Sequence, residues 1–109
     1  RSIEAGGRRA EVVDWPAAGR PASADAVVNA TSLGLHGEDP LEGTPLPAVV
    51  VDIVAIAGGT PLVKRARAAE NVTVVDGQEM LLHQATRSFE LWTGVPAPVA
   101  VMRAALPRS

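Results

Sequence analysis

The sequence predicts an α/β protein whose parallel sheet is covered by helices. Apolar, β-branched runs at residues 25–30, 48–56 and 72–75 have the length and composition of buried strands. The second run, AVVVDIVAI, is the strongest, and continuous apolar runs are typical of parallel sheets with helices on both faces. Helical signals follow the second and third runs, and strands that alternate with helices indicate a parallel arrangement.

Capping residues mark where the helices begin. Thr60 is a good N-cap and Pro61 suits the first helical position, which predicts a helix to about residue 69. The pair Asp76-Gly77 turns the chain into a long helix over residues 78–92, which a Thr-Gly pair ends. Both helices are therefore predicted from local signals alone.

The long helix also carries apolar residues at helical spacing, which predicts a stripe that packs into the core. The members of this stripe are Leu81, Ala85, Phe89 and Trp92. A last helix over residues 97–106 is expected to close the chain, and the glycines and prolines of residues 33–47 predict a long loop.

The first 24 residues have the weakest pattern. Residues 11–15 form a short strand candidate, and the stretch EAGGRR at 4–9 has the composition of a phosphate loop. No strand precedes that stretch and no clear helix follows it, so we interpret it as a loop or a helix end. We expect a poorly defined segment over 1–24, and one domain over 25–109.

Composition excludes several classes of protein. The 109 residues are 47% hydrophobic and 3% aromatic with a net charge of −2, and the scattered basic residues do not favour nucleic acid as a partner. The absence of cysteine excludes disulfides and thiolate chemistry. No apolar run has the length of a membrane span, and no signal peptide opens the chain, so we expect a cytoplasmic protein.

Polar residues gather where the first apolar run ends. Asn29, Thr31 and Ser32 follow a run that lacks alternation and is therefore predicted to be buried on both faces. Ligands of parallel sheets bind outside the carboxyl ends of the strands, and small polar residues there can bond a phosphate, a ribose or a carboxamide. An ordinary polar turn explains the same residues equally well.

Two further residue types were weighed as functional. Gln84 lies on the first turns after a strand, at the same edge of the sheet, although a glutamine on a helix flank is usually just solvated. His36 and His83 have no partners at metal-ligand spacing, so no metal site is expected.

Several of these stretches together resemble the second half of the shikimate dehydrogenase family. The motifs NATSLG, VVVDIV, TPLVKRA, DGQEMLLHQA and FELWTGVPAP occur in the right order and spacing over residues 25–106. The resemblance implies a two-domain, NADP-dependent oxidoreductase of aromatic amino acid biosynthesis, which interconverts 3-dehydroshikimate and shikimate. It also implies a Rossmann-like domain here and a missing amino-terminal domain that binds the substrate and carries a catalytic Lys–Asp pair.

The resemblance also implies which residues hold the ligands. Those implied in cofactor binding are Asn29, Thr31, Ser32, Ile53 and Gly77. Gln84 is implied in substrate binding, and Ala55 stands where the family usually has a substrate-contacting tyrosine. No residue of this chain matches the catalytic pair, so no catalytic residue is assigned.

In the classic Rossmann strand order 3-2-1-4-5-6, the chain would supply strands 3 to 6. Residues 11–15 would then lack a neighbouring strand, so we expect a stable three-stranded unit from Asp25 onward. The sequence reads as a piece of a longer protein and does not separate NADP from NAD. Two other interpretations stay open: a paralogue that has changed substrate or only binds the cofactor, and a small free-standing α/β domain that binds a partner.

Overall fold

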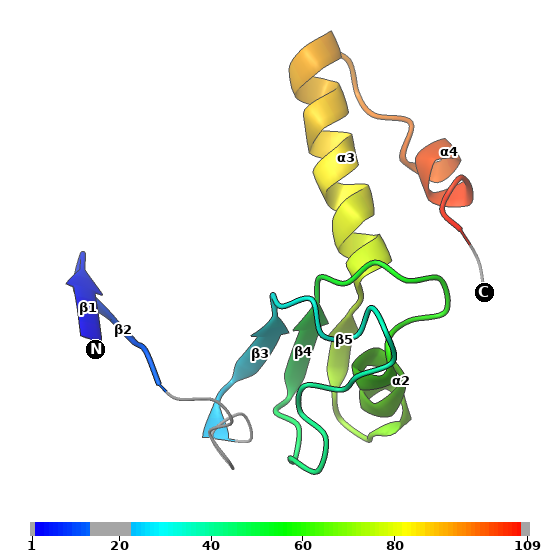
Figure 1. Ribbon diagram of the computed structural model, residues 1–109. Helices are drawn as coiled ribbons and strands as arrows, with labels where there is room; N and C mark the ends of the chain where they lie inside the picture. The colour runs from blue at the N-terminus through cyan, green and yellow to red at the C-terminus, as the bar shows by residue number, and fades with distance from the viewer. Residues whose placement is uncertain (1, 14–22, 108–109) are drawn as a thin grey trace.

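A three-stranded parallel sheet forms the centre of the computed structural model, which describes residues 2–13 and 23–107 (Figure 1). Its strands lie in the order β3-β4-β5. Their bounds are Ala26–Asn29 for β3, Val49–Asp52 for β4 and Thr73–Val75 for β5. Both pairings are parallel, which confirms the predicted class of sheet.

Helix α2 (Pro61–Ala68) crosses from β4 to β5 and contributes Leu62, Val63 and Ala66 to the core. The Thr60 hydroxyl accepts the N–H of Val63 at 3.2 Å, so the predicted N-cap is confirmed. The buried core cluster consists of Leu41, Val50, Leu62 and Ala66. Leu41 comes from the long loop, so this loop closes the core on one side of the sheet.

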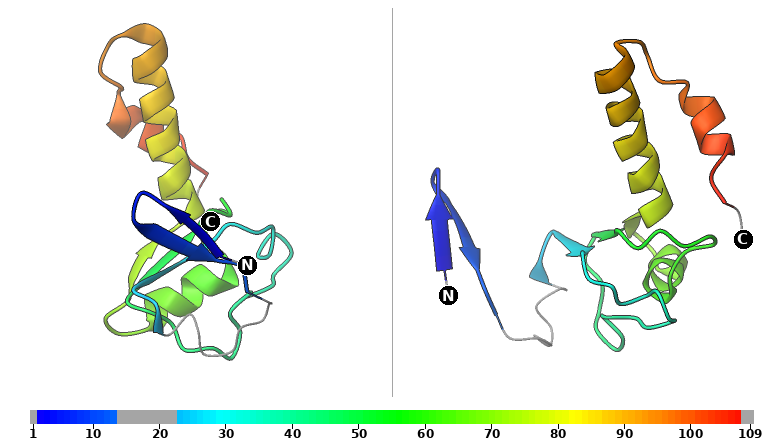
Figure 2. Two further views of the ribbon diagram at one scale, coloured as in Figure 1. Left: turned by 90° about the vertical axis from the view of Figure 1, so that its left-hand side faces the viewer. Right: turned by 45° about the horizontal axis from the view of Figure 1, so that its top comes forward.

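Helix α3 (Gly77–Thr93) follows β5 directly and extends away from the sheet (Figure 1). The Asp76 carboxylate accepts the N–H of Glu79 at 2.8 Å and caps the helix. Gly94, in the left-handed conformation at φ 72°, ends it where the sequence predicted. Helix α4 (Val99–Ala104) is shorter than the predicted 97–106 and returns beside α3 (Figure 2).

The apolar stripe predicted on α3 is not a core face. Leu81 is 46% exposed and Trp92 is 84% exposed, while Ala85 and Phe89 are only partly covered. The residues of α3 that are buried are Gly77, Leu82 and Thr86. Helical spacing identified residues that share a face, but in the described part of the chain little packs on that face beyond α4.

β3 is also less covered than predicted. Val28 is 56% exposed, whereas Asn29 at the end of the strand is buried. Within the described residues β3 pairs with β4 alone, so it is an edge strand with one open side. The expectation of burial on both faces was therefore wrong for this strand. Within residues 2–13 and 23–107, no helix combines the length and apolarity needed to cross a membrane.

The amino-terminal segment forms a β-hairpin that the sequence analysis missed. β1 (Ser2–Ala5) and β2 (Arg8–Glu11) pair antiparallel across Gly6 and Gly7, whose φ angles are 58° and 75°. Two successive positive φ angles are the mark of a tight hairpin turn, which a Gly-Gly pair permits. The stretch EAGGRR is thus neither a phosphate loop nor a helix end.

The predicted strand at 11–15 is wrong where the structure tests it. Glu11 ends β2, residues 12 and 13 lie outside any strand, and residues 14 and 15 lie outside the described residues. The glycine pair fixes the register of the hairpin and so moves the strand toward the amino terminus. Among the described residues the central sheet has three strands, the number expected from Asp25 onward.

The amides of the hairpin and of the central sheet should differ in their rates of hydrogen exchange. Every residue of β1 and β2 is exposed, and Figure 2 shows the hairpin apart from β3. Isolated two-stranded hairpins are marginal in water, so we expect the hairpin amides to exchange at least about tenfold faster than those of β4. Equal protection of the two would mean that the hairpin is packed against the sheet.

Candidate functional site

The carboxyl ends of the strands bring most of the predicted residues to one edge of the sheet. A small hollow of about 150 Å³ opens there. Its lining consists of Ile53, Ala55, Gly77, Met80, Leu81 and Gln84. Four residues that the sequence analysis singled out, from the end of β4 and the start of α3, therefore share one cavity.

The chemistry of this hollow is simple. Its walls are aliphatic and sulfur-containing side chains with backbone, and Gln84 contributes the one side-chain amide. Gln84 is exposed, and its side-chain amide makes no hydrogen bond within residues 2–13 and 23–107. An amide both donates and accepts hydrogen bonds, so it can bond a ligand hydroxyl in either direction. An apolar slot with one free amide fits a flat ring that carries polar substituents.

Gly77 is required by the chain's own backbone. A Cβ at this position would lie 2.4 Å from the backbone carbon and oxygen of Val54 and 2.6 Å from the nitrogen of Ala55. The family resemblance implied this glycine in cofactor binding. The close approach seen here is that of the segment after β4, which the glycine allows to rest on the start of α3.

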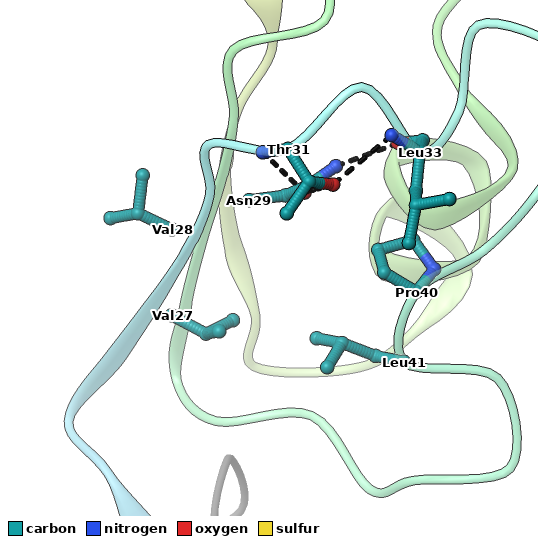
Figure 3. Close-up of a pocket in the computed structure, with 7 residues that line it drawn as sticks. All are labelled: Val27, Val28, Asn29, Thr31, Leu33, Pro40 and Leu41. Atoms are coloured by element: carbon teal, nitrogen blue, oxygen red, sulfur yellow. Dashed lines mark hydrogen bonds between the residues drawn. The ribbon is translucent and has the colours of Figure 1, made fainter. Parts of the chain in front are cut away.

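Asn29 and Thr31 line a different hollow, of about 300 Å³, on the open side of β3 (Figure 3). Its other lining residues are Val27, Val28, Leu33, Pro40 and Leu41. Ser32 is exposed and lines neither hollow. The two groups of predicted cofactor residues are in direct contact through backbone, where the Ile53 N–H donates to the Asn29 carbonyl at 3.1 Å.

The side chain of Asn29 is fully occupied by its own neighbours, and Figure 3 shows its bonds to Thr31 and Leu33. Its amide nitrogen donates to the Leu33 carbonyl at 2.9 Å and to the Asp52 carboxylate at 3.1 Å. Its oxygen accepts from the N–H and the hydroxyl of Thr31, at 3.1 and 2.6 Å. An asparagine amide has two hydrogens to donate and two lone pairs to accept with, so none is left for a ligand.

The long loop after the NATS turn is fastened to α2 by an arginine. The Arg65 guanidinium donates to Asp39 at 2.8 Å, to the Leu41 carbonyl at 2.8 Å and to the Thr44 carbonyl at 3.1 Å. Because a guanidinium presents several donors in a fixed plane, one side chain holds three points of the loop.

The Glu38 carboxylate accepts hydrogen bonds from backbone N–H groups of the same loop. Hydrogen bonds from the backbone N–H of Glu38 itself, of His36 and of Gly34 lower the pKa of the Glu38 carboxyl. The bonds from His36 and Gly34 measure 2.8 and 3.2 Å. Because the pKa of Glu38 is lower in the folded state than in the unfolded state, ionised Glu38 stabilises the fold. This stabilisation is complete above the unfolded-state pKa and is lost as the pH falls through the folded-state pKa.

Acid titration by NMR should report this loss. We expect the amide signals of Gly34 and His36 to move together, with one midpoint below the pKa of an ordinary glutamate, about 4.3. The variant Glu38→Gln should abolish the transition. A midpoint at the ordinary value, or signals that move separately, would contradict the arrangement.

Other expectations about the site concern absences and the cofactor. Among the described residues, no group of three or more His, Cys, Asp or Glu side chains is placed to hold a metal ion. The hollow beside Gly77 is lined by apolar side chains and one amide, a chemistry that fits a carboxamide-bearing ring such as nicotinamide, whereas the hairpin at residues 2–11 offers no helix N-terminus for a phosphate. The fit therefore extends to the ring end of a dinucleotide.

Comparison with known proteins places the chain in a family. Residues 77–106 match the family profile described as "Shikimate 5'-dehydrogenase C-terminal domain". The chain is 45% identical over 83 residues to the shikimate dehydrogenase (NADP(+)) of Nitrosopumilus maritimus, covering 73% of this chain and 30% of the relative. The protein of the same name from Dinoroseobacter shibae is 46% identical over 105 residues, covering 91% of this chain and 37% of the relative. The chain belongs to the shikimate dehydrogenase family.

Solved structures agree with this assignment. The shikimate 5-dehydrogenase of Listeria monocytogenes, in complex with shikimate and NAD, is similar to this chain with a TM-score of 0.63 at 28% identity. The match covers 76% of this chain and 30% of that one. The Rossmann-like class of the sheet is thereby confirmed. The chain spans about a third of the length of the shikimate dehydrogenases that it matches.

Sequence reasoning missed one residue of this region. Asp52 ends β4, is fully buried, and bonds both Asn29 and the Thr60 hydroxyl. Its signal was a carboxylate inside an otherwise continuous apolar run. A charged residue in such a place needs buried partners, which local sequence patterns do not identify.

Proposed function

We propose that this chain supplies the carboxyl-terminal part of an NADP-dependent shikimate dehydrogenase, which interconverts 3-dehydroshikimate and shikimate. The observation that carries the proposal is the hollow shared by Ile53, Ala55, Gly77 and Gln84. Membership of the shikimate dehydrogenase family supports the reaction, and the NADP named for its relatives supports the cofactor.

The chain's own residues would bind and orient the ligands. NADP, when bound, supplies or accepts the hydride at its nicotinamide ring. The aliphatic wall formed by Ile53 would exclude water from one side of that ring, and the start of α3 at Gly77 would limit its position. Gln84, whose amide oxygen and nitrogen are both free of bonds within the described residues, would hold a hydroxyl of shikimate.

Proton transfer would fall to the missing amino-terminal domain, which we propose as the partner of this chain. Two uncovered surfaces support such a partner. A hollow of about 310 Å³ between α3 and α4 is lined by Phe89, Trp92 and Met102, and Gln84 lines both it and the smaller hollow. Val28 and the open side of β3 form the second surface. We place the assembled enzyme in the cytoplasm, as the composition suggests.

A second function is favoured by one residue. Ala55 leaves open the part of the hollow where the family usually has a tyrosine. A paralogue with a different acid as substrate, or a module that only binds the cofactor, would account for that substitution.

A hybrid enzyme tests the proposal. Residues 25–106 replace the matching part of the Dinoroseobacter shibae shikimate dehydrogenase, whose own amino-terminal part is kept, and NADP reduction is followed with shikimate. We expect shikimate-dependent turnover, because the grafted part carries the cavity residues. A folded hybrid that binds NADP but turns over no shikimate would favour the second function, and one that binds neither ligand would overturn both.

The chain alone provides the matched control. We expect no dehydrogenase turnover from the 109 residues by themselves, since none of them matches the catalytic Lys–Asp pair of the family. If the chain alone shows turnover and a substitution within it abolishes that turnover, the proposal that the amino-terminal domain carries the catalytic residues is contradicted.

A further inference from the structure

One buried carboxylate connects the backbone segments around the proposed cofactor face. Asp52 Oδ1 accepts from the Asn29 amide at 3.1 Å and from the Val54 N–H at 3.0 Å. Asp52 Oδ2 accepts from the Thr60 hydroxyl at 2.7 Å. The side chain is 0% exposed and no buried polar side-chain atom of the described residues lacks a partner. Asp52 therefore joins the ends of β3 and β4 to the start of α2.

The bond to Asn29 reaches further than one residue. Asn29 uses its oxygen to hold both the N–H and the hydroxyl of Thr31, and that hydroxyl accepts the N–H of Leu33 at 3.0 Å. With its donors fixed on Asp52 and on the Leu33 carbonyl, the amide has a single orientation. The shape of the NATS turn therefore depends on an acceptor that lies 23 residues along the chain.

We propose that Asp52 is a positioning residue for cofactor binding and that Asn29 transmits its effect. Through Asn29 it would fix the turn at Thr31 and Ser32, and through the Val54 N–H it would fix the backbone on either side of Ile53. Asn29, implied by family resemblance as a cofactor residue, then supports the turn and contacts no ligand itself. This inference rests on the proposed function for the role in cofactor binding, whereas the link from Asp52 to the turn is tested without it.

The two oxygens of Asp52 allow the proposal to be separated from a merely structural role. Oδ1 serves the two segments beside the ligands, whereas Oδ2 serves the cap of α2. The variant Asp52→Ala removes both connections. The variant Asp52→Asn keeps an oxygen for Asn29 and Val54 but offers an N–H where Thr60 needs an acceptor. The variant Thr60→Val loses the bond to Asp52 Oδ2 and the cap of α2 but keeps both bonds of Oδ1, so it is the matched control.

The first readout is amide exchange in the 109-residue chain, normalised to the amides of β4, which report global unfolding. We expect Asp52→Ala to speed exchange at Thr31 and Leu33 by about tenfold or more, since a lost charge-assisted bond is worth 1.4 kcal/mol or more. Asp52→Asn should stay within about threefold and Thr60→Val within about twofold of the original at these two amides. Equal effects of Asp52→Ala and Thr60→Val, or none from Asp52→Ala, would overturn the proposal.

A second variant keeps the test decisive if Asp52→Ala does not fold. Asn29→Asp keeps the size of the side chain and an oxygen for Thr31, but it loses the donors to Asp52 and to the Leu33 carbonyl and sets two carboxylates within hydrogen-bond distance. Protection at Thr31 should fall by about tenfold relative to β4. Unchanged protection would contradict the connection from Asp52 to the turn.

The second readout is the KM for NADP in the hybrid enzyme. We expect Asp52→Ala to raise it by about tenfold with the KM for shikimate within about twofold, and Asp52→Asn to recover most of the loss. Thr60→Val should leave both constants within about twofold. If exchange changes as expected but the KM for NADP does not, Asp52 supports the fold without positioning the cofactor. An inactive hybrid counts against the proposed function, and the exchange result still decides the link from Asp52 to the turn.

Discussion

Replacing Gly77 by alanine is expected to destabilise the chain by about 3 kcal/mol or more, because overpacking against rigid atoms costs 1–3 kcal/mol and occasionally more. The added Cβ would meet backbone atoms of Val54 at 2.4 Å, and backbone cannot rotate away as a side chain can. Helix propensity alone predicts the opposite sign, a gain of up to about 1 kcal/mol for alanine in a helix. Urea unfolding of the two proteins measures the difference.

Gly94→Ala is the matched control for this variant. Gly94 ends the same helix, and a Cβ there meets nothing within 4 Å, but its φ of 72° is left-handed. The conformational cost alone should be about 1–2 kcal/mol. If Gly77→Ala unfolds at the same urea concentration as the original chain or above it, the segment after β4 does not rest on Gly77 as described.

The second large effect concerns the substrate end of the hollow, in the hybrid enzyme. Ala55→Tyr should lower the KM for shikimate by about tenfold or more, because a hydrogen bond to a charged group is worth 1.5–3 kcal/mol. Gln84→Ala should raise the same constant by a similar factor, since it removes the one side-chain amide of the hollow. Both effects are expected mainly in KM, because the residues are proposed to bind substrate and not to move a proton.

Ala55→Phe separates the two contributions of the tyrosine. It fills the hollow without adding a hydroxyl, so we expect less than half of the improvement in binding free energy. If all three variants leave the KM for shikimate unchanged, this hollow does not hold the substrate. If Ala55→Tyr and Gln84→Ala both raise the KM for shikimate, the hollow accommodates a larger acid, as the second candidate function requires.

Local signals in the sequence predicted the elements of the central domain. Thr60 with Pro61, Asp76 and Gly94 mark helix ends through bonds and φ angles that involve only near neighbours in the chain. Such signals do not depend on the rest of the fold, so the predicted ends lie within a residue of the observed ones. The apolar runs likewise predicted the parallel strands, because burial requires that composition.

The failures come from features that depend on what surrounds an element. Periodicity placed Leu81 and Trp92 on one face of α3, but whether a face is buried depends on its partner, and most of this face is open. Gly6 and Gly7 are a hairpin signal in a stretch that the sequence analysis interpreted as a loop or a helix end. The local information was present there, but the strands on either side of the glycine pair were not recognised.

The candidate site was predicted in part. Ile53, Ala55, Gly77 and Gln84 do meet in one cavity, because the carboxyl ends of adjacent parallel strands share an edge. Asn29 and Thr31 lie beside another hollow. The bond from Asn29 to Asp52 spans two strands, and no local pattern reveals which buried polar groups pair across a sheet.

A crystal structure of the hybrid enzyme with NADP and shikimate would test the central claim most directly. The account predicts that the nicotinamide ring lies between the Ile53 segment and the start of α3, with a shikimate hydroxyl within hydrogen-bond distance of the Gln84 amide, about 2.7–3.2 Å. It also predicts that the Asn29 side chain contacts Asp52 and Thr31 and neither ligand. Ligands bound in the hollow beside β3, or shikimate held without Gln84, would contradict it.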